Sequence, residues 1–409
     1  MDLGELLIER KNGISNIRKL NDLVLEYIKT NKLIIFGGQA IDYALRLKGD
    51  KLYPDYEIAD YDFYSPNNVI DAYNIFRKLI EQKVEYLSVL PAYHPGTMRV
   101  RVDNLYYLAD SGYIDKLIYK FVLDTSLNYK GILFRHPFLQ YSDQCRAFSY
   151  PFEIAGPIPT ILHRFIKDKD RFLKLYSHYP INDKTVKEFT NLVSKLDLNK
   201  DWKGNNLVEF EEGLVYCGLE AYYVYQCIQG GQEIKEIKIK GNELVYSNKP
   251  SGRFKPVQGS MISGLRKDTE KNRFYVLPQN QIGYHIIDIK GKKIKIASIQ
   301  FVIICIYSLM LDDLKYSKDK SPYLSVYLEL LKIMETEWTK TKIKPYFLPS
   351  INMIGDKYKS VLELYLEEHP EEEKDIKPPA FYYSPLVRKE DIVSEIPTEY
   401  DYHEAYGFK

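Results

Sequence analysis

The sequence predicts an α+β protein with two sheet-containing regions joined by a helical one. Three observations carry this prediction: strand and helix patterns alternate over residues 33–109, helical patterns occupy residues 143–200, and strand patterns resume after residue 205. A chain of 409 residues is also too long for one ordinary core, since single cores stop growing at about 250–300 residues. Because 45% of the residues are hydrophobic, we expect two or three well-packed domains.

The first region is expected to open with a helix and a short strand. Apolar residues recur at the spacing of one buried helix face, at Ile14, Ile17, Leu20, Val24 and Ile28. The apolar run 33–36 then predicts a buried strand, which Gly37-Gly38 ends. A helix is expected from about residue 39 to residue 47, because Lys48-Gly49 is typical of a helix C-terminus.

The remainder of this region predicts a small mixed sheet covered by helices. Ser65-Pro66 should open a helix that runs to about residue 81, because serine caps helices and proline fits their first position. Asp103-Asn104 is typical of a tight hairpin turn. Strands are expected at 58–64, 84–90, 98–102 and 105–109. The order is therefore βαβαβ plus a hairpin.

Composition limits the class of protein. The formal net charge of +1 excludes a histone-like polycation but permits local basic grooves. The four cysteines form no CxxC pair, which argues against a structural zinc site or a disulfide framework and favours a reducing compartment. The N-terminus lacks the apolar core of a signal peptide, and the longest apolar run, 301–311, is about half of a membrane span. We therefore expect a soluble, intracellular protein with no membrane partner.

A glycine pair and a pair of aspartates predict the chemistry. Gly37-Gly38 lies at a strand-to-helix junction, where glycine lets the backbone approach a phosphate and the helix N-terminus aims N–H groups at it. Asp60 and Asp62 are two residues apart on a predicted strand, so both should point to one face. Carboxylates are the hard oxygen ligands that Mg²⁺ prefers. The motifs together predict a site that binds a triphosphate and divalent ions, as nucleotidyl transfer requires.

A third carboxylate would complete such a site, and two residues qualify. Asp103 lies in the predicted turn, where aspartate is common for turn formation alone. Asp110 ends an apolar strand, where an acidic residue is otherwise unexpected. We therefore choose Asp110 as the third ligand.

These motifs resemble those of a known superfamily. A glycine pair followed by Asp-x-Asp is similar to the nucleotidyltransferase pattern. The segments IIFGGQAIDYAL, IADYDFYSP, YHPGTMRVRVDNLYYLAD and DQCRAFSYP further resemble the poly(A) polymerase catalytic subunits of large DNA viruses. The gap between the glycines and Asp60 is wider than in many bacterial relatives, although the viral branch tolerates it. The resemblance covers most of residues 30–300 and fades beyond them.

The resemblance implies an activity and partners. It implies template-independent addition of AMP from ATP to the 3′ end of viral mRNA, assisted by two Mg²⁺ or Mn²⁺ ions. It also implies a homodimer or a partner processivity subunit, located in cytoplasmic viral factories or in virions. Two alternatives stay open: another nucleotidyltransferase of the CCA-adding or oligoadenylate type, or a non-catalytic RNA-binding scaffold.

Specific residues are assigned to this chemistry. We expect Asp60 and Asp62 to bind both ions, and Asp110 to join them at the ion that activates the RNA 3′-hydroxyl. Five residues are expected to bind ATP. The glycine motif assigns Gly37, Gly38 and Gln39, and the family resemblance implies Arg146 and Ser149.

A basic stripe is predicted on the helix that follows Pro159. Its members recur at spacings of three, four and three residues, namely Arg164, Lys167, Arg171 and Lys174. Such a stripe could neutralise RNA or triphosphate oxygens. An ordinary solvated face is an equal alternative, because Asp168 and Asp170 interleave the cations.

The second sheet-containing region shows an echo of the first. LVYCGLEAYY, residues 214–223, is similar to IIFGGQAIDY, which sets Gly218 against Gly38. Further matches set Leu244 against Asp62 and Ala297 against Asp110, so the ligand carboxylates are replaced. We hypothesise a degenerate duplicate used for scaffolding and RNA contact, with chance likeness as the alternative.

The chain is accordingly divided into five predicted segments. The C-terminal one has little helical or strand periodicity and should wrap a neighbouring domain, dock on a second subunit or be partly mobile. The segments are an N-terminal helical segment (1–32), a catalytic nucleotidyltransferase domain (33–142), a helical region that completes the nucleotide and RNA cleft (143–204), a degenerate nucleotidyltransferase-like domain (205–345) and a C-terminal extension (346–409).

Overall fold

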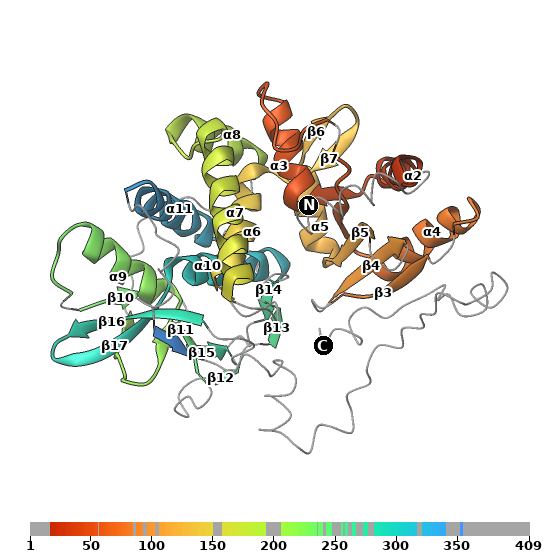
Figure 1. The fold of residues 1–409 in the computed structure, drawn as a ribbon. Coiled ribbons are helices and arrows are strands. Elements are labelled where there is room, and N and C mark those ends of the chain that lie inside the picture. The colour runs from red at the N-terminus through yellow and green to blue at the C-terminus, as the bar shows by residue number, and fades with distance from the viewer. Residues whose placement is uncertain are drawn as a thin grey trace, which may run out of the picture. The chain divides into compact units, whose positions relative to one another are not determined.

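In the computed structural model the chain divides into two compact units, one reaching Gln140 and the other beginning at Tyr141 (Figure 1). The five-segment division is finer than this and stays a prediction. No helix among the residues described below has the length and apolar character that crossing a membrane requires. The structure describes residues 17–55, 57–84, 87–92, 96–102, 106–149, 158–193, 206–234, 236–239, 243–247, 255–256, 258–260, 264–266, 273–276, 282–316, 321–340 and 352–354.

The first unit contains a mixed sheet, as the sequence predicts. Its strand order is β3-β4-β5-β2-β1-β7-β6. β1 is antiparallel to β2 and parallel to β7, while β2 is parallel to β5. The strands are β1 (Ile34–Phe36), β2 (Tyr61–Ser65), β3 (Ser88–Pro91), β4 (Thr97–Val102), β5 (Tyr106–Tyr113), β6 (Leu127–Tyr129) and β7 (Ile132–Phe134).

Helices α2 (Ile17–Thr30) and α4 (Asn68–Ile80) pack against each other and against β5. The predicted buried face of α2 is confirmed for every member that the structure describes, since Ile17, Leu20, Val24 and Ile28 are buried. Ile14 lies outside the described residues. Two further helices of this unit are α3 (Gly37–Arg46) and α5 (Lys116–Asp124).

Helix α4 begins later than predicted. Ser65 is the last residue of β2, where it pairs with Tyr113. Its hydroxyl accepts the N–H of Asn67 at 2.8 Å and donates to Asp71. The serine therefore closes the turn between strand and helix and does not act as the helix cap.

Some elements were missed by the sequence analysis. It found neither α5 nor the β6–β7 hairpin, whose strands have three residues each. The hairpin turns at Lys130-Gly131, where both residues have positive φ (51° and 84°), as a tight type I′ turn requires. The strand predicted at 84–90 is observed from Ser88. The predicted turn at Asp103-Asn104 lies outside the described residues.

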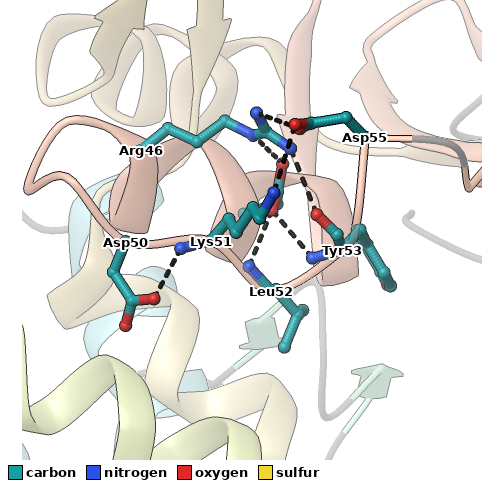
Figure 2. Close-up of polar contacts among 7 residues, drawn as sticks. Arg46, Asp50, Lys51, Leu52, Tyr53 and Asp55 are labelled. Atoms are coloured by element: carbon teal, nitrogen blue, oxygen red, sulfur yellow. Dashed lines mark hydrogen bonds and ion pairs between the residues drawn. The ribbon is translucent and has the colours of Figure 1, made fainter.

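A polar network orders the loop that follows α3 (Figure 2). Asp42 of α3 is buried, and its Oδ1 accepts the N–H groups of Leu52 and Tyr53 at 2.8 and 3.0 Å. Its Oδ2 accepts Arg46 Nε at 2.5 Å, and Arg46 also donates to Asp55 at 3.1 Å. The wide gap between the glycine pair and the Asp-x-Asp motif thus contains a loop that α3 itself holds in place.

The second unit contains another mixed sheet, ordered β12-β15-β11-β9-β17-β16-β18. The strands β8 and β10 form a separate two-stranded sheet, and so do β13 and β14. The strands are β8 (Asn206–Leu207), β9 (Val215–Tyr216), β10 (Lys238–Ile239), β11 (Glu243–Tyr246), β12 (Lys255–Pro256), β13 (Gln258–Ser260), β14 (Gly264–Arg266), β15 (Arg273–Val276), β16 (Ile282–Ile289), β17 (Lys292–Ala297) and β18 (Asn352–Ile354).

Helices form the remainder of the second unit. Phe172 of α7 meets Trp338 of α11 edge to face at 5.1 Å, and Cys145 Sγ of α6 lies 3.7 Å from the sulfur of Met334. The long apolar run 301–311 lies in α10 and is buried. The helices are α6 (Pro137–Ser149), which starts in the first unit, α7 (Ile158–His178), α8 (Asp183–Leu192), α9 (Leu219–Gln229), α10 (Ile299–Tyr316) and α11 (Tyr323–Lys340).

The second sheet repeats the central topology of the first. Each sheet has a strand that is followed by a helix (β1–α3 and β9–α9). That strand is antiparallel to the next strand of the same sheet (β2 and β11), which is parallel to a later one (β5 and β15). On its other side, the first strand is parallel to one strand of a hairpin (β7, β17). One difference is that β12 runs parallel to β15, whereas β4 is antiparallel to β5.

The strand pairs correct the glycine alignment between the sheets. The register that aligns Tyr246 with Tyr64 also places Gly218 at the position of Gly37. The sequence alignment set Gly218 against Gly38 and was wrong by one residue. A single glycine can be aligned with either member of a glycine pair, and the sequence does not show which of the two directly follows the strand.

The same register corrects the third ligand position. Leu244 stands at the place of Asp62, as predicted, and Phe274 stands at the place of Asp110. The prediction of Ala297 for this place was wrong, because Ala297 lies in β17, the counterpart of β7. Each of these two positions in the second sheet therefore carries an apolar residue.

We predict that Asp42→Ala loosens the loop after α3. The substitution leaves the N–H groups of Leu52 and Tyr53 without their buried acceptor, which typically costs about 1–3 kcal/mol. Hydrogen exchange at those two amides should accelerate strongly, as measured by mass spectrometry. Asp50→Ala is the control, because Asp50 lies in the same loop and its Oδ1 accepts the N–H of Lys51, whereas the N–H groups of Leu52 and Tyr53 go to Asp42. Equal acceleration in both variants would contradict the role of Asp42.

Candidate active site

Four side chains form a row across one face of the first sheet. Asp62 of β2 pairs with Phe36 of β1 on one side and with Asp110 of β5 on the other. Asp110 in turn pairs with Arg99 of β4. Directly opposed residues share a sheet face, and all four are half-buried. Their strand neighbours on the opposite face are completely buried, namely Ile35, Phe63, Ala109 and Val100.

Gly37 brings the start of α3 onto the carboxylate of Asp62. Its φ is +67°, which strains any L side chain, and a Cβ at this position would lie 2.5 Å from Asp62 Oδ2, so a substitution would force that carboxylate to move. The N–H of Gly37 donates to Gln140 Oε1 at 3.3 Å. Gly38 and Gln39 occupy the first turn of α3 and are half-buried. The start of α3 and the carboxylate of Asp62 are therefore in direct contact.

Asp60 lies just before β2 and not within a strand as predicted, since the strand begins at Tyr61. The preceding carbonyl, of Ala59, accepts Asn21 Nδ2 from α2 at 3.0 Å. Asp60 is half-buried, and its negative charge helps to raise the pKa of Arg99. The electrostatic contact places Asp60 in the same charged group as the row.

Arg99 was not singled out by the sequence analysis. Its Nε donates to Asp110 Oδ1 at 2.7 Å and its Nη2 to Asp110 Oδ2 at 2.5 Å. These hydrogen bonds raise the pKa of the guanidinium above its ordinary value, against the opposing effect of burial. The ring of Tyr107 lies 4.0 Å from the guanidinium carbon. The third predicted ligand is therefore held by a cation.

A β-bulge makes this arrangement possible. The pairing of β4 with β5 shifts after Val100, so that Arg101 faces Tyr107 and Leu108 is the extra residue. In an unbroken strand Tyr107 and Asp110 would point to opposite faces, because side chains alternate. The bulge turns Tyr107 onto the face of Asp110, a known use of bulges beside functional sites.

An aromatic stack supports the row from the side of β1. The rings of Phe36 and Tyr64 lie parallel, with centroids 4.0 Å apart. Gly112 lies beside both rings, and a Cβ there would make ordinary van der Waals contact with each at 3.5 Å. The hydroxyl of Tyr64 accepts Arg135 Nη1 at 3.2 Å. Sequence reasoning missed these residues, although the period-two spacing of Tyr64 from Asp62 places it on the same face.

The donor chemistry of this row suits divalent ions. Asp62 and Asp110 offer carboxylate oxygens on adjacent strands, with Asp60 nearby, and hard cations prefer such ligands. As they are arranged, the described residues contain no group of three or more His, Cys, Asp or Glu side chains that could hold a metal ion. Binding by all three aspartates would therefore require a side chain to move.

The other predicted ATP ligands lie in the second unit. Arg146 is half-buried in α6. Ser149 is completely buried, and its hydroxyl donates to the carbonyl of Cys145 at 2.8 Å. The serine hydroxyl thus already has an acceptor within its own helix.

The predicted basic stripe lies on α7 around one buried carboxylate. Arg171, Arg164 and Lys167 lie 3.6, 3.9 and 4.0 Å from Asp168. Burial raises the pKa of Asp168, and the three cations oppose that effect. Lys174 is half-buried further along the helix. Part of the positive charge is therefore balanced within the stripe.

The fold and the row together define a class of protein. A Gly-Gly turn opens a helix beside Asp-x-Asp, and a third aspartate stands in register on the next parallel strand. This is the arrangement expected of nucleotidyltransferases, which hold a triphosphate against metal-binding carboxylates.

Comparisons with known proteins narrow the class. Residues 22–154 match the family model described as Poly(A) polymerase catalytic subunit. Proteins assigned as poly(A) polymerase catalytic subunits in two African swine fever virus isolates, Kenya 1950 and Badajoz 1971, are 37% identical over 173 residues. A protein of Acanthamoeba polyphaga mimivirus with the same assignment is 23% identical over 218 residues. Over the matched segment, the chain is similar to the poly(A) polymerase catalytic subunits of large DNA viruses.

The extent of these matches differs between sequence and fold. The African swine fever virus alignments cover 42% of this chain and 36% of theirs, and the mimivirus alignment covers 51% and 35%. The chain thus spans little more than a third of the length of these curated relatives. The crystal structure of the Megavirus polyadenylate synthase matches 99% of this chain and 89% of that one, with a TM-score of 0.56 and 14% identity. That likeness concerns the fold.

We predict that Gly37→Ala destabilises the fold more than Gly49→Ala does. Both glycines have positive φ, but a Cβ at Gly49 would meet nothing within 4 Å. Gly49→Ala should cost only the left-handed backbone strain, about 1–2 kcal/mol. Gly37→Ala should cost more, because the added Cβ must also displace Asp62. Chemical denaturation gives the loss in free energy of unfolding for each variant. Equal losses would contradict the close approach of Gly37 to Asp62.

Proposed function

We propose that the chain is a template-independent adenylyltransferase that adds AMP from ATP to the 3′ end of viral mRNA. The observation that carries the proposal is the register of Asp62 with Asp110 beside the Gly37 turn. The family match over residues 22–154 supports it. The alternatives within the class are CCA addition and short oligoadenylate synthesis, and the choice of nucleotide in a primer assay separates them.

In the proposed mechanism, Asp60, Asp62 and Asp110 hold two divalent ions, Mg²⁺ or Mn²⁺. Such ions lower the pKa of the attacking 3′-hydroxyl and neutralise charge on the transferred phosphoryl group. The carboxylates fix where the hydroxyl meets the phosphorus, which is the main catalytic task when the protein forms no covalent bond. No separate general base is needed.

The start of α3 is proposed to bind the triphosphate. Gly37 already donates its N–H to the amide oxygen of Gln140, and a phosphate oxygen would take that place. Gly38 and Gln39 follow at the helix N-terminus, which favours anions. The nucleotide would thus lie between backbone N–H groups and the row of aspartates.

Arg146 and Ser149 stay proposed ATP-binding residues on the strength of the family resemblance. Ser149 would have to release its hydrogen bond to the carbonyl of Cys145 to bind the nucleotide. The α7 stripe is proposed to bind RNA or triphosphate with the charge that Asp168 leaves unbalanced. A homodimer or a separate processivity subunit is part of the proposal, and sedimentation of the purified chain with RNA tests it.

We further propose that the second sheet is a degenerate nucleotidyltransferase-like domain that serves as scaffold and RNA contact. Its topology matches that of the first sheet, and Leu244 and Phe274 stand where aspartates would be needed. Gly218 keeps its close approach, since a Cβ there would lie 2.9 Å from Leu244 Cβ. The steric feature of the motif is therefore present without its metal ligands.

In the second sheet, Glu220 occupies the position that corresponds to the proposed phosphate position of the first. Its Oε1 accepts the N–H of Gly218 at 2.8 Å and that of Leu244 at 3.3 Å. The side chain is completely buried, and burial raises its pKa to about 8. A carboxyl group of the chain itself thus takes the N–H that we propose for a phosphate in the first sheet. One ATP per chain is the expected stoichiometry.

We predict that an RNA primer is extended into a ladder with ATP, in the presence of Mg²⁺ or Mn²⁺, and far less with other nucleotides. Asp60→Ala, Asp62→Ala and Asp110→Ala should each lower the rate by at least about 100-fold, because each removes a ligand for the ions. Asp124→Ala, which removes an exposed partner of Lys120, should leave the rate unchanged. Undiminished extension by the Asp60 or Asp62 variant would refute the assignment.

The raised pKa of Glu220 gives a pH dependence of stability. The folded chain holds a proton, with a pKa of about 8 against an ordinary 4.5, that the unfolded chain releases. The stabilisation is complete below pH 4.5 and is lost as the pH rises towards 8. Glu220→Gln has no such proton to lose, so its free energy of unfolding should fall less between pH 5 and 8 than that of the unsubstituted chain. The two slopes should differ by at most about 1.4 kcal/mol per pH unit.

Urea unfolding at several pH values measures this difference. Glu233→Gln is the control, because Glu233 is exposed, and its pH profile should run parallel to that of the unsubstituted chain. If Glu220→Gln also gave a parallel profile, the proton would not be held by Glu220.

A further inference from the structure

The strongest unexplained feature of the site is the cation on its third carboxylate. Arg99 binds Asp110 through both of its oxygens, with Nε–Oδ1 at 2.7 Å and Nη2–Oδ2 at 2.5 Å. The side chains of Arg99 and Asp110 are 23% and 13% exposed. A fork of this kind, shielded from water, is among the stronger protein ion pairs. Asp110 therefore enters the reaction already paired.

The pairing conflicts with metal binding at Asp110. A divalent ion bound by Asp110 would lie close to the positive guanidinium, and like charges that share a carboxylate repel each other. The described residues hold no ready group of three metal ligands, in keeping with a carboxylate engaged elsewhere. Arg99 cannot lose its charge to resolve the conflict, since arginine stays protonated in proteins.

The surroundings hold Arg99 at this place. The Tyr107 ring packs 4.0 Å from the guanidinium carbon, and the bulge at Leu108 puts that ring on the correct face. Stacking on an aromatic face suits the flat guanidinium and adds to its attraction. Three separate features, the strand register, the bulge and the tyrosine, therefore converge on one arginine.

We propose that Arg99 is a positioning residue that stands in for a cation at Asp110 and weakens ion binding there until a phosphate group draws the guanidinium away. The proposal rests on the proposed function, because it takes Asp110 as an ion ligand. The triphosphate or the RNA backbone supplies the anion, since guanidinium binds phosphate oxygens in the same forked manner. Ion binding at the third carboxylate then depends on the presence of substrate.

Mn²⁺ binding to the full chain without nucleotide tests the proposal directly. Electron paramagnetic resonance of free Mn²⁺ gives the affinity without any measurement of activity. Arg99→Gln should bind Mn²⁺ at least about tenfold more tightly than the unsubstituted chain, because a positive charge beside the ion is removed. Unchanged or weaker binding would overturn the proposal, since an arginine that merely supports a metal ligand is expected to strengthen binding.

Arg101→Gln is the matched control. Arg101 lies two residues along the same strand, and its Nε donates to Ser88 Oγ at 3.1 Å. Its removal changes the net charge equally but leaves Asp110 paired, so Mn²⁺ affinity should stay within about twofold. A tightening equal to that of Arg99→Gln would mean that overall charge is responsible, which would overturn the proposal.

Two further variants distinguish an effect on ion binding from an effect on folding and test the link through Asp110. Arg99→Met keeps the aliphatic stem over Tyr107 and should tighten Mn²⁺ binding as Arg99→Gln does, even where the glutamine disturbs folding. In an Asp110→Asn background, Arg99→Gln should lose most of its effect, because the two residues act as a pair. A full effect in that background would overturn the link through Asp110.

The outcome is separable from that of the proposed function. If Asp60→Ala and Asp62→Ala bind Mn²⁺ as well as the unsubstituted chain, the assigned ion site fails, whatever Arg99 does. If those variants lose Mn²⁺ and primer extension while Arg99→Gln fails to tighten binding, the function stands and the role of Arg99 falls.

Discussion

The site depends on one steric fact, the contact between the backbone of Gly37 and the carboxylate of Asp62. A Cβ at Gly37 would lie 2.5 Å from Asp62 Oδ2, so any larger residue would push the Asp62 carboxylate away from the start of α3. That contact sets the distance between the proposed phosphate donors and the proposed metal ligands. The parallel pairing of β2 with β5 then adds Asp110, and the remainder of the unit fixes these three elements.

Charge is the second constraint, because three carboxylates near one another repel. Arg99 offsets this repulsion at Asp110, while the start of α3 offers its positive dipole to Asp62. Both devices come from regular elements, a strand and a helix, and not from loops. The second sheet meets the same problem differently, since apolar residues replace the aspartates and Glu220 is buried with a raised pKa.

Much of this arrangement could be predicted from sequence, and the failures have physical causes. The glycine turn, the Asp-x-Asp motif and the preference for Asp110 rest on patterns local to one strand. Arg99 could not be found in that way, because its role depends on cross-strand register and on a bulge at Leu108 that leaves no local signal. The duplicate was aligned one residue off, because letters alone do not show which glycine follows the strand.

Gly218 shows that a glycine at this position can serve the packing of helix against strand without serving nucleotide binding. A Cβ at Gly218 would lie 2.9 Å from Leu244 Cβ, and one at Gly37 would lie 2.5 Å from Asp62 Oδ2, yet Leu244 offers no metal ligand. A glycine at the end of such a strand is thus required by the crossing of helix and strand, whether or not a nucleotide ever binds. Searches that count glycine turns will therefore report more active domains than exist, whereas searches that demand the opposing aspartate will not.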